Sequence, residues 1–236
     1  MSLKSKRKMV NTLQQSYLMC NWNLSPRDAI ELQKKLSRKV KITKYQGKLE
    51  LVAGCDVSFS RDLGCAAVVV MKLPEFEIVE KEIFIDFVEY PYIPGLLAFR
   101  EGPLLLQAIN KLKIKPDIFI FDGQGIAHPR GLGIASHMGV LLDIPTIGCA
   151  KSILIGKYQN LGNKKGDFSP LIYRGKIVGY ALRTRENVKP VFVSPGNLCN
   201  FEDAREIVLK CCKKYRLPEP LRQAHIESNA HIQEGV

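Results

Sequence analysis

Three carboxylic acids occupy positions where the surrounding residues predict burial, and together they could bind a metal ion. Asp56 follows the apolar run 51–55, Asp122 ends the apolar run 118–121, and Glu101 falls on the same helical stripe as the leucines around it. A buried carboxylate is costly unless it is paired with a cation or bound to a metal. An ordinary salt bridge or exposure to solvent explains any one of these acids better, but three of them favour one shared site.

The ligand type indicates which ion would bind and what it would do. Carboxylates without cysteine suit Mg²⁺ or Mn²⁺ rather than zinc. Magnesium typically takes one or two carboxylates and completes its coordination with water and substrate phosphate oxygens. Two such ions can activate a water molecule and stabilise the leaving oxygen of a phosphodiester. The acids therefore predict metal-dependent hydrolysis of a phosphate ester.

The charge of the chain is consistent with a polyanionic substrate. Its 236 residues carry a formal net charge of +12 at pH 7, and lysine and arginine are spread over the whole length. This charge indicates either a soluble basic surface or attraction to nucleic acid, and by itself it does not separate the two. Together with the three acids, it favours a phosphate polymer as the substrate.

Three further side chains could take part in this chemistry. Lys151 follows the apolar run 146–150, where a lysine can hold a phosphate as a point charge, although an isolated lysine there more often only extends into solvent. His128 lies in the glycine-rich segment 123–133 and either contacts substrate or ties the loop down. His225 is structural unless its expected helix packs over the three acids, where it could titrate or bind a water on the phosphate.

The segment Pro91-Tyr92-Ile93-Pro94 could contact nucleic acid in another way. Its two prolines stiffen a short loop that presents an aromatic and an aliphatic side chain. Stiff apolar side chains can wedge between bases, and aromatic rings stack on exposed bases. The alternative is a buried turn whose tyrosine packs on the core. These four residues alone do not decide between the two.

The order of the expected elements predicts a mixed α/β fold. Strands are expected at 49–59, 65–73, 78–88, 117–122, 145–149, 171–173, 176–183 and 191–194, and helices at 26–40, 97–112, 134–142, 200–215 and 218–230. Ser25 and Asn200 are the expected N-caps, and Pro103 is expected to begin or kink its helix. The first three strands predict an antiparallel meander, and the later apolar strands a parallel arrangement. We expect one domain, residues 1–236, with helices packed on both faces of the sheet.

The cysteines and the absence of a long apolar run predict the compartment. The seven cysteines are odd in number and form no Cys-x-x-Cys pair, which indicates reduced structural thiols rather than disulfides or a zinc site. No run approaches the ~18 apolar residues of a membrane span. The basic N-terminus is not followed by the apolar core of a signal peptide. We therefore expect a cytoplasmic protein without a membrane partner.

Several long motifs, in one order along the chain, closely resemble the endonuclease V family. They are Val52-Ala-Gly-Cys-Asp-Val-Ser-Phe59, the segment 91–103, Phe121-Asp-Gly-Gln-Gly-Ile-Ala-His-Pro129, Leu132-Gly-Ile-Ala-Ser-His-Met-Gly139, Ile147-Gly-Cys-Ala-Lys151 and Val193-Ser-Pro-Gly196. The resemblance runs from about Leu24 to His225. Long motifs in a fixed order are far more specific than a four-residue pattern.

The resemblance implies a fold and an activity. The fold is ribonuclease-H-like, a mixed sheet in which an antiparallel meander is followed by parallel strands, flanked by helices. The activity is Mg²⁺-dependent hydrolysis of the second phosphodiester bond 3′ to deoxyinosine in DNA, with Mn²⁺ as an expected substitute. The products are 3′-hydroxyl and 5′-phosphate ends, and the process served is DNA repair.

The resemblance also implies roles for individual residues. Asp56, Glu101 and Asp122 match the family's metal-binding acids, His225 matches the histidine near that site, and Lys151 matches the lysine near the scissile phosphate. The remaining matches concern the substrate. Tyr92 belongs, with Pro91, Ile93 and Pro94, to the wedge that separates the strands, and Gly125 and His128 match the loop around the lesion pocket. We expect that pocket to be built partly from backbone groups near Gly95 and in the segment 123–133.

Two other functions are compatible with the same residues. One is a noncatalytic lesion-binding module that has kept the fold, although the presence of all three acids disfavours it. The other is an endonuclease that acts mainly on inosine in RNA. We expect the protein to be a monomer. The basic extension 1–11 matches none of these family motifs, and we expect it either to be flexible or to add nonspecific phosphate contacts.

Overall fold

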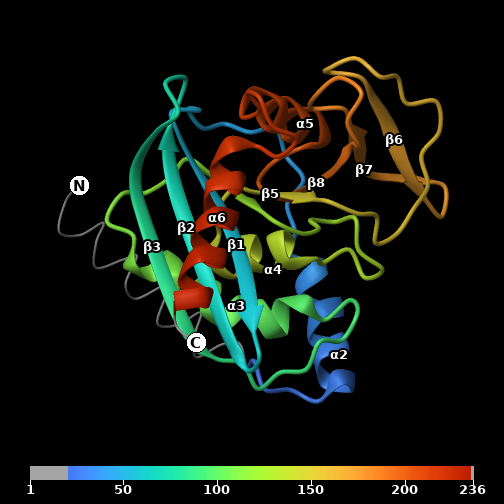
Figure 1. The fold of residues 1–236 in the computed structure, drawn as a ribbon. Helices are drawn as coiled ribbons and strands as arrows, with labels where there is room; N and C mark the ends of the chain where they lie inside the picture. Colours follow the sequence, from blue (N-terminus) through green and yellow to red (C-terminus); the bar gives the residue numbers. More distant parts are fainter. Residues whose placement is uncertain (1–20, 235–236) are drawn as a thin grey trace.

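The computed structural model describes residues 21–234, and its centre is an eight-stranded mixed sheet with the order β3-β2-β1-β4-β5-β8-β7-β6 (Figure 1). The strands are β1 (Leu51–Ser60), β2 (Leu63–Lys72), β3 (Glu77–Phe87), β4 (Ile118–Phe121), β5 (Thr146–Ala150), β6 (Phe168–Tyr173), β7 (Lys176–Leu182) and β8 (Val191–Asn197). The helices are α2 (Pro26–Ser37), α3 (Leu97–Lys111), α4 (Ile134–Leu142), α5 (Phe201–Lys210) and α6 (Glu219–Glu234). The predicted extension 1–11 lies outside the described residues.

The pairing of the strands confirms the predicted mixed sheet. Strands β1, β2 and β3 form the antiparallel meander, and β4 pairs in parallel with β1 on one side and β5 on the other. Strands β8, β7 and β6 then add antiparallel pairs beyond β5, including the predicted hairpin between β6 and β7. The parallel part is thus short and central, and the carboxyl ends of β4 and β5 lie side by side.

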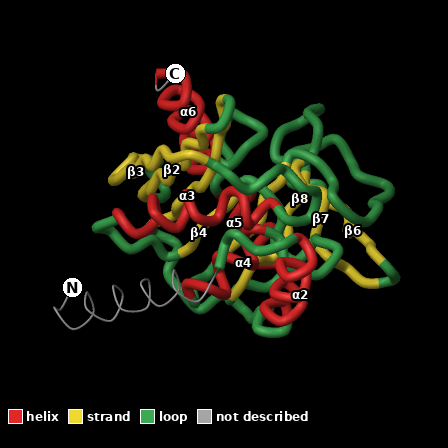
Figure 2. The backbone as a smooth tube through the Cα atoms, turned by 90° about the horizontal axis from the view of Figure 1, so that it is seen from below, coloured by secondary structure: helices red, strands yellow, loops and turns green. Residues whose placement is uncertain are grey.

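Helices cover both faces of the sheet, as the sequence pattern predicted. Ala53 and Cys55 of β1 belong to the hydrophobic core under α3 and α4, whereas Val52 belongs to the core under α5 and the start of α6. Side chains alternate between the faces of a strand, so Asp56 shares the face of Val52. In Figure 2, α6 lies on one side of the sheet and α2 and α4 lie on the other.

Close packing of α6 on β1 depends on a glycine. A Cβ atom at Gly54 would lie 2.1 Å from the carbonyl oxygen of Pro220. A side chain at this position would push the first turn of α6 away from the strand. Because His225 and Ser228 follow in the next two turns, Gly54 indirectly sets how closely these side chains approach the sheet.

The local signals located the helix starts better than the helix ends. Ser25 Oγ accepts from the backbone N–H of Asp28 at 3.2 Å, and Asn200 Oδ1 accepts from that of Asp203 at 2.7 Å, so both predicted caps are confirmed. Helix α5 ends at Lys210, before the predicted 215. Pro103 lies inside α3, as its seventh residue, rather than at its start, so its missing N–H leaves one intrahelical hydrogen bond unmade.

Two further sequence predictions concern the thiols and membranes. Six cysteines among residues 21–234 are free and buried, in agreement with the predicted structural thiols, and Cys20 lies outside the described residues. No helix in this part of the chain is long and apolar enough to cross a membrane.

Candidate active site

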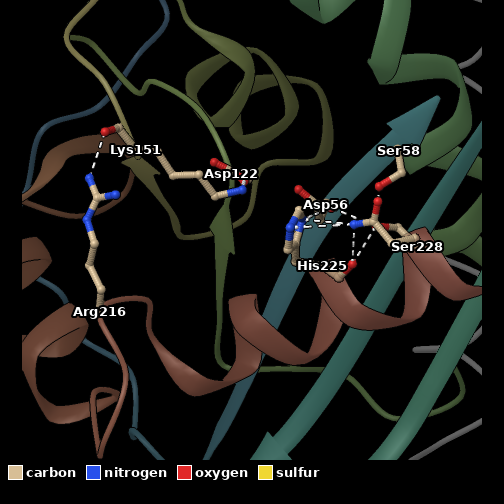
Figure 3. A network of polar contacts seen from close by, with 8 residues as sticks. Asp56, Ser58, Asp122, Lys151, Arg216, His225 and Ser228 are labelled. Atoms are coloured by element: carbon tan, nitrogen blue, oxygen red, sulfur yellow. Dashed lines mark hydrogen bonds and ion pairs between the residues drawn. The ribbon is translucent and has the colours of Figure 1, made fainter.

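Asp56 lies in the middle of β1 and is fixed by side chains of α6 (Figure 3). Its carboxylate is 6% exposed. Oδ2 accepts from Ser228 Oγ at 2.7 Å and contacts His225 Nδ1 at 3.0 Å. Ser228 Oγ also lies 2.8 Å from Ser58 Oγ, and because it donates its one proton to Asp56 it must accept from Ser58. The protein thus holds Asp56 through Oδ2.

Asp122 directly follows β4 and meets a lysine from the end of β5. The backbone N–H of Asp122 donates to the carbonyl of Cys55 at 3.0 Å, which places its side chain beside Asp56. Lys151 Nζ lies 2.6 Å from Asp122 Oδ2. The carboxyl ends of neighbouring parallel strands bring these two residues together, as expected for sites in α/β sheets.

The third acid, Glu101, reaches the same place from α3. It is buried, and burial raises its pKa well above the usual range, with further contributions from the charges of Asp56 and Asp122. Burial and the charge of Asp56 likewise raise the pKa of Asp122 to about 6, although the cation of Lys151 opposes this. The three carboxyl groups therefore repel one another when ionised, in a place with little access to water. Among the described residues, only one lysine, Lys151, forms an ion pair with any of them.

This arrangement fits a divalent cation. Ligand atoms of Asp56, Asp122 and His225 all lie within 4.8 Å of one another, and the charges of both aspartates act on Glu101. A donor set dominated by carboxylate oxygens is the type that Mg²⁺ and Mn²⁺ prefer. A bound cation would also remove the mutual repulsion that raises the pKa values of Glu101 and Asp122. The structure thus brings Asp56, Asp122, Lys151 and His225 together, and Glu101 lies outside this close group but near enough for the charges of both aspartates to raise its pKa.

The interpretation of His225 from the sequence depended on whether its helix packs over the acids, and α6 does so. With Nδ1 directed at the Asp56 carboxylate, the Nδ1–H tautomer is favoured, and Nε2 is then the basic nitrogen of the neutral ring. Asn229 Nδ2 donates to the backbone carbonyl of His225 at 2.7 Å and supports this turn of the helix. About two fifths of the His225 side chain is exposed, so water and substrate can reach it.

Lys151 is held at its backbone by an arginine from the segment between α5 and α6. Arg216 Nη2 donates to the carbonyl of Lys151 at 2.7 Å (Figure 3) and to that of Pro190 at 2.6 Å. These bonds fix the chain at the end of β5, where the lysine side chain turns toward Asp122. Lys151 therefore does not simply extend into solvent.

A pocket of about 310 Å³ opens beside the acids. Its lining includes Asp122 and Lys151, then Gln33, Tyr92 and Gly95, and several residues of the segment 123–134. Pockets of this size are typical of small-molecule sites. The pocket connects the predicted chemistry with the predicted binding loops.

The loop Pro91–Pro94 stands at the rim of this pocket. Tyr92 is 69% exposed, so it does not pack on the core, and the alternative of a buried turn does not apply to it. Pro91 and Pro94 are exposed as well, and Ile93 is half-buried. An exposed tyrosine between two prolines is a stiff projection next to a cavity.

Gly125 and His128 are enclosed by protein. Gly125 packs so tightly on β8 that a Cβ atom there would lie 2.0 Å from the carbonyl oxygen of Pro195, and its N–H donates to Ser194 Oγ at 2.8 Å. His128 is buried, and its Nε2 lies 2.9 Å from the carbonyl oxygen of Gly95. Of the two roles considered for His128, this geometry favours tying down the loop.

Replacement of Gly125 by alanine is expected to destabilise the protein. The methyl group would collide with backbone that cannot turn aside, which typically costs about 1–3 kcal/mol. At about 2–4 °C per kcal/mol for a chain of this size, the melting temperature should fall by several degrees. Gly131→Ala is the comparison, because a Cβ there meets nothing within 4 Å and adds only the strain of φ +67°. A larger loss for Gly131→Ala in differential scanning fluorimetry would contradict this.

Sequence reasoning missed the residues that orient the site rather than form it. Ser58, Ser228, Arg216, Gln33 and Arg130 act through contacts between distant segments. The polar Ser58 in a buried strand, two residues from Asp56, was a signal that could have been used. The others have ordinary local sequence contexts.

The comparisons with known proteins agree with this site. A profile of the endonuclease V family matches residues 33–226. Endonuclease V of Gloeobacter violaceus is 51% identical over 219 residues, which cover 91% of this chain and 89% of that protein. The chain belongs to the endonuclease V family.

Solved structures give the same result for the fold. Endonuclease V of Streptomyces avermitilis superposes on this endonuclease V with a TM-score of 0.86 at 37% identity, covering 91% of this chain and 96% of that one. The Ciona intestinalis enzyme, in complex with a 24mer DNA that contains an inosine followed by a ribo-adenosine, gives a TM-score of 0.78 at 28% identity and covers 89% and 98%. The ribonuclease-H-like mixed sheet is thus confirmed, and the protein is a nuclease that uses a divalent metal.

Proposed function

We propose that this endonuclease V recognises deoxyinosine in DNA and hydrolyses the second phosphodiester bond on its 3′ side, with Mg²⁺ as the cofactor. Its products are then a 3′-hydroxyl and a 5′-phosphate, and the reaction begins the repair of deaminated adenine. The observation that carries the proposal is the adjacency of the Asp56–Asp122–His225 cluster to the pocket at the rim of which Tyr92 stands. Chemistry on a phosphate and capture of a base can then occur in one complex.

Binding begins with attraction of the duplex to the positively charged protein, followed by insertion of the loop Pro91–Pro94. The net charge of +12 attracts the duplex, and this attraction weakens with salt. Tyr92, with Pro91, Ile93 and Pro94, enters between bases and holds the strands apart. The hypoxanthine base leaves the stack, which is easiest for a poorly paired base, and enters the pocket beside Gly95. The walls near Gly125 and His128 keep their shape because both residues are packed on protein.

The side chains at the cluster then act on the phosphate. Asp56, Glu101 and Asp122 are the residues that would hold Mg²⁺, which when bound polarises the phosphate and lowers the pKa of water. Lys151 holds a phosphate oxygen with its ammonium group. His225 takes a proton from the attacking water through Nε2, because Nδ1 faces Asp56.

The reaction is a hydrolysis without a covalent enzyme intermediate. The water oxygen forms a bond to phosphorus as the P–O3′ bond breaks, and the leaving O3′ takes a proton from solvent to become the hydroxyl. The side chains around the phosphate work by holding charge and moving one proton. Metal-assisted phosphoryl transfer requires a protein to position the reacting groups and to stabilise the charge that develops on the phosphate.

An incision assay tests this function. A duplex with one labelled deoxyinosine should be nicked once, at a fixed offset on the 3′ side, only when Mg²⁺ or Mn²⁺ is present, and the matched adenine duplex should stay intact. Direct sealing of the nick by a DNA ligase reports the 3′-hydroxyl and 5′-phosphate. Tight binding without any nick would favour the noncatalytic lesion-binding module instead.

The same assay separates DNA from RNA as substrate. The Ciona relative was solved with a ribonucleotide after the inosine, so a preference for RNA is the specific alternative. Matched DNA, RNA and single-ribonucleotide strands should be compared at equal salt, because contacts to a 2′-hydroxyl favour RNA. We expect the all-DNA substrate to be cleaved fastest, and faster cleavage of all-RNA strands would reverse the assignment.

The organisation of the working protein follows from the same proposal. We infer one catalytic domain that acts as a monomer, since all five proposed catalytic residues lie on one chain. The buried free thiols support a reducing compartment such as the cytoplasm. Gel filtration with light scattering checks the monomer.

A further inference from the structure

Three side chains from two other parts of the chain form hydrogen bonds with the carbonyl oxygen of Gly95. It accepts from Gln33 Nε2 at 3.0 Å, lies 2.9 Å from His128 Nε2 and accepts from Arg130 Nη2 at 2.6 Å. A carbonyl oxygen has two lone pairs, so three donors saturate it. Gly95 directly follows the loop Pro91–Pro94 and has a φ of +81°. The end of this loop, which we call the wedge loop, is therefore hydrogen-bonded to residues that lie far from it in sequence.

Gln33 is the centre of this network. It is 1% exposed and lies on the buried side of α2 with Ala29 and Leu36. Its Oε1 accepts from Arg130 Nε at 2.5 Å, and its Nε2 also lies 3.4 Å from the carbonyl of Leu132. One amide thus connects α2 with the wedge loop and with the segment between β4 and α4. A buried amide is tolerated only when bonded in this way, so the contacts are specific.

The histidine of the network is locked in one tautomer. His128 Nδ1 accepts from the backbone N–H of Arg130 at 3.2 Å, so Nε2 carries the proton that goes to Gly95. Burial and then the charge of Arg130 lower the pKa of His128 to about 4. The ring is therefore neutral at physiological pH and donates constantly. His128 and Arg130 thus both hold the wedge loop against the pocket through the carbonyl of Gly95.

We propose that Gln33, acting with Arg130, is a positioning residue that fixes the wedge loop relative to the base pocket. This inference rests on the proposed function. In a duplex, Tyr92 must separate the strands while the neighbouring nucleotide enters the pocket, so the loop and the pocket must keep a set distance. On a single strand no separation is needed, and the pocket alone suffices. Loss of the network should therefore impair incision of duplex far more than incision of single strands.

The test compares two substrates in single-turnover incision. Gln33→Leu keeps the size of the side chain but removes the amide, and Arg130→Lys keeps the charge but removes the fork that reaches both Gln33 and Gly95. Each should lower the rate on duplex inosine by about tenfold, the loss that misplacement of a preorganised group can cause. Arg130→Lys should leave the rate on a single-stranded inosine oligomer within about twofold of wild type, whereas Gln33→Leu, whose side chain also lines the pocket, should lose less on the single strand than on duplex. Tyr92→Ala should give the same duplex-selective pattern.

A control variant and the ratio of the two rates test the positioning role separately from the proposed function. Gln107→Leu, on the half-buried side of α3 and outside the network, should leave both rates unchanged. Equal losses on duplex and single strand, or no loss in a folded Gln33→Leu protein, would overturn the positioning role. If Gln33→Leu fails to fold by circular dichroism, the ratio of the two rates in Arg130→Lys, whose side chain is half-buried, decides the question. Failure of the wild type to cut any inosine strand would instead refute the proposed function.

Discussion

Asp56→Asn is expected to reduce Mg²⁺-dependent incision at inosine by about 10³-fold, because it removes a charged ligand where several kcal/mol of transition-state stabilisation arises. The fold and the affinity for inosine duplex should be kept. The asparagine has the same shape, and its Oδ1 can accept from Ser228 as Oδ2 of Asp56 does at 2.7 Å. Single-turnover incision in Mg²⁺, with binding measured in Ca²⁺ by fluorescence anisotropy, gives the two quantities. Turnover within about tenfold of wild type would exclude Asp56 as a ligand.

The same variant should be more stable than wild type when no metal is present. Asp56 is an electrostatic cause of the raised pKa of both Glu101 and Asp122, so its neutralisation removes repulsion in the folded state. Asp62→Asn is the matched control, because Asp62 is exposed in the turn between β1 and β2. That control should change neither incision nor the metal-free melting temperature. A lower melting temperature for Asp56→Asn in EDTA would contradict the view that the acids repel one another.

Removal of divalent metal should make the protein less stable as the pH rises. The folded pKa of Asp122 is about 6 and that of Glu101 is well above 4.5, both above their unfolded values. The folded state therefore binds these protons more tightly than the unfolded state. The destabilisation is absent below the unfolded pKa values, grows from about pH 4 upward, and is complete only above the folded pKa values. In EDTA, the melting temperature should thus be higher at pH 5.5 than at pH 7.5.

Magnesium should reverse this loss. A ligand at 100 times its dissociation constant adds about 2.7 kcal/mol of stability, which for a chain of this size corresponds to about 5–10 °C in melting temperature. The gain should be larger at pH 7.5 than at pH 5.5, because protons compete for the carboxylates. Asp56→Asn should lose most of the gain, and K⁺ at equal ionic strength should not produce it. A melting temperature independent of Mg²⁺ at pH 7.5 would contradict a metal site at these acids.

The sequence predicted the elements closely wherever a local signal was present. The apolar runs around Asp56 and Asp122 gave β1 and β4, and Ser25 and Asn200 gave the starts of α2 and α5. Helix ends were less certain, as α5 shows, because the turn that ends it is fixed by a bond from the N–H of Glu219 to the carbonyl of Cys211. Such a bond depends on where the next helix packs, which no local pattern encodes.

The convergence of the acids was predictable for a physical reason. Each stands beside apolar residues that must be buried, so the free energy of burial alone brings them inside, where they need a common partner. Their mutual distances were not predictable, because they depend on the register of β1 with β4 and on the contact of α6 with β1. The approach of His225 to Asp56 within 3.0 Å is one result of that packing.

The sequence by itself predicted the chemistry of this member of the endonuclease V family: three acids beside apolar runs, a lysine after a buried strand and a stiff aromatic loop indicate a metal-dependent site for nucleic acid. Only the tertiary structure decided which side chains orient the residues of the site. Gln33 meets Gly95 across 62 positions and Ser228 meets Asp56 across 172, and both pairings arise from helices docking on other elements. Apolar burial leaves a pattern along the chain, whereas a hydrogen bond between distant segments exists only once the fold has placed its two partners.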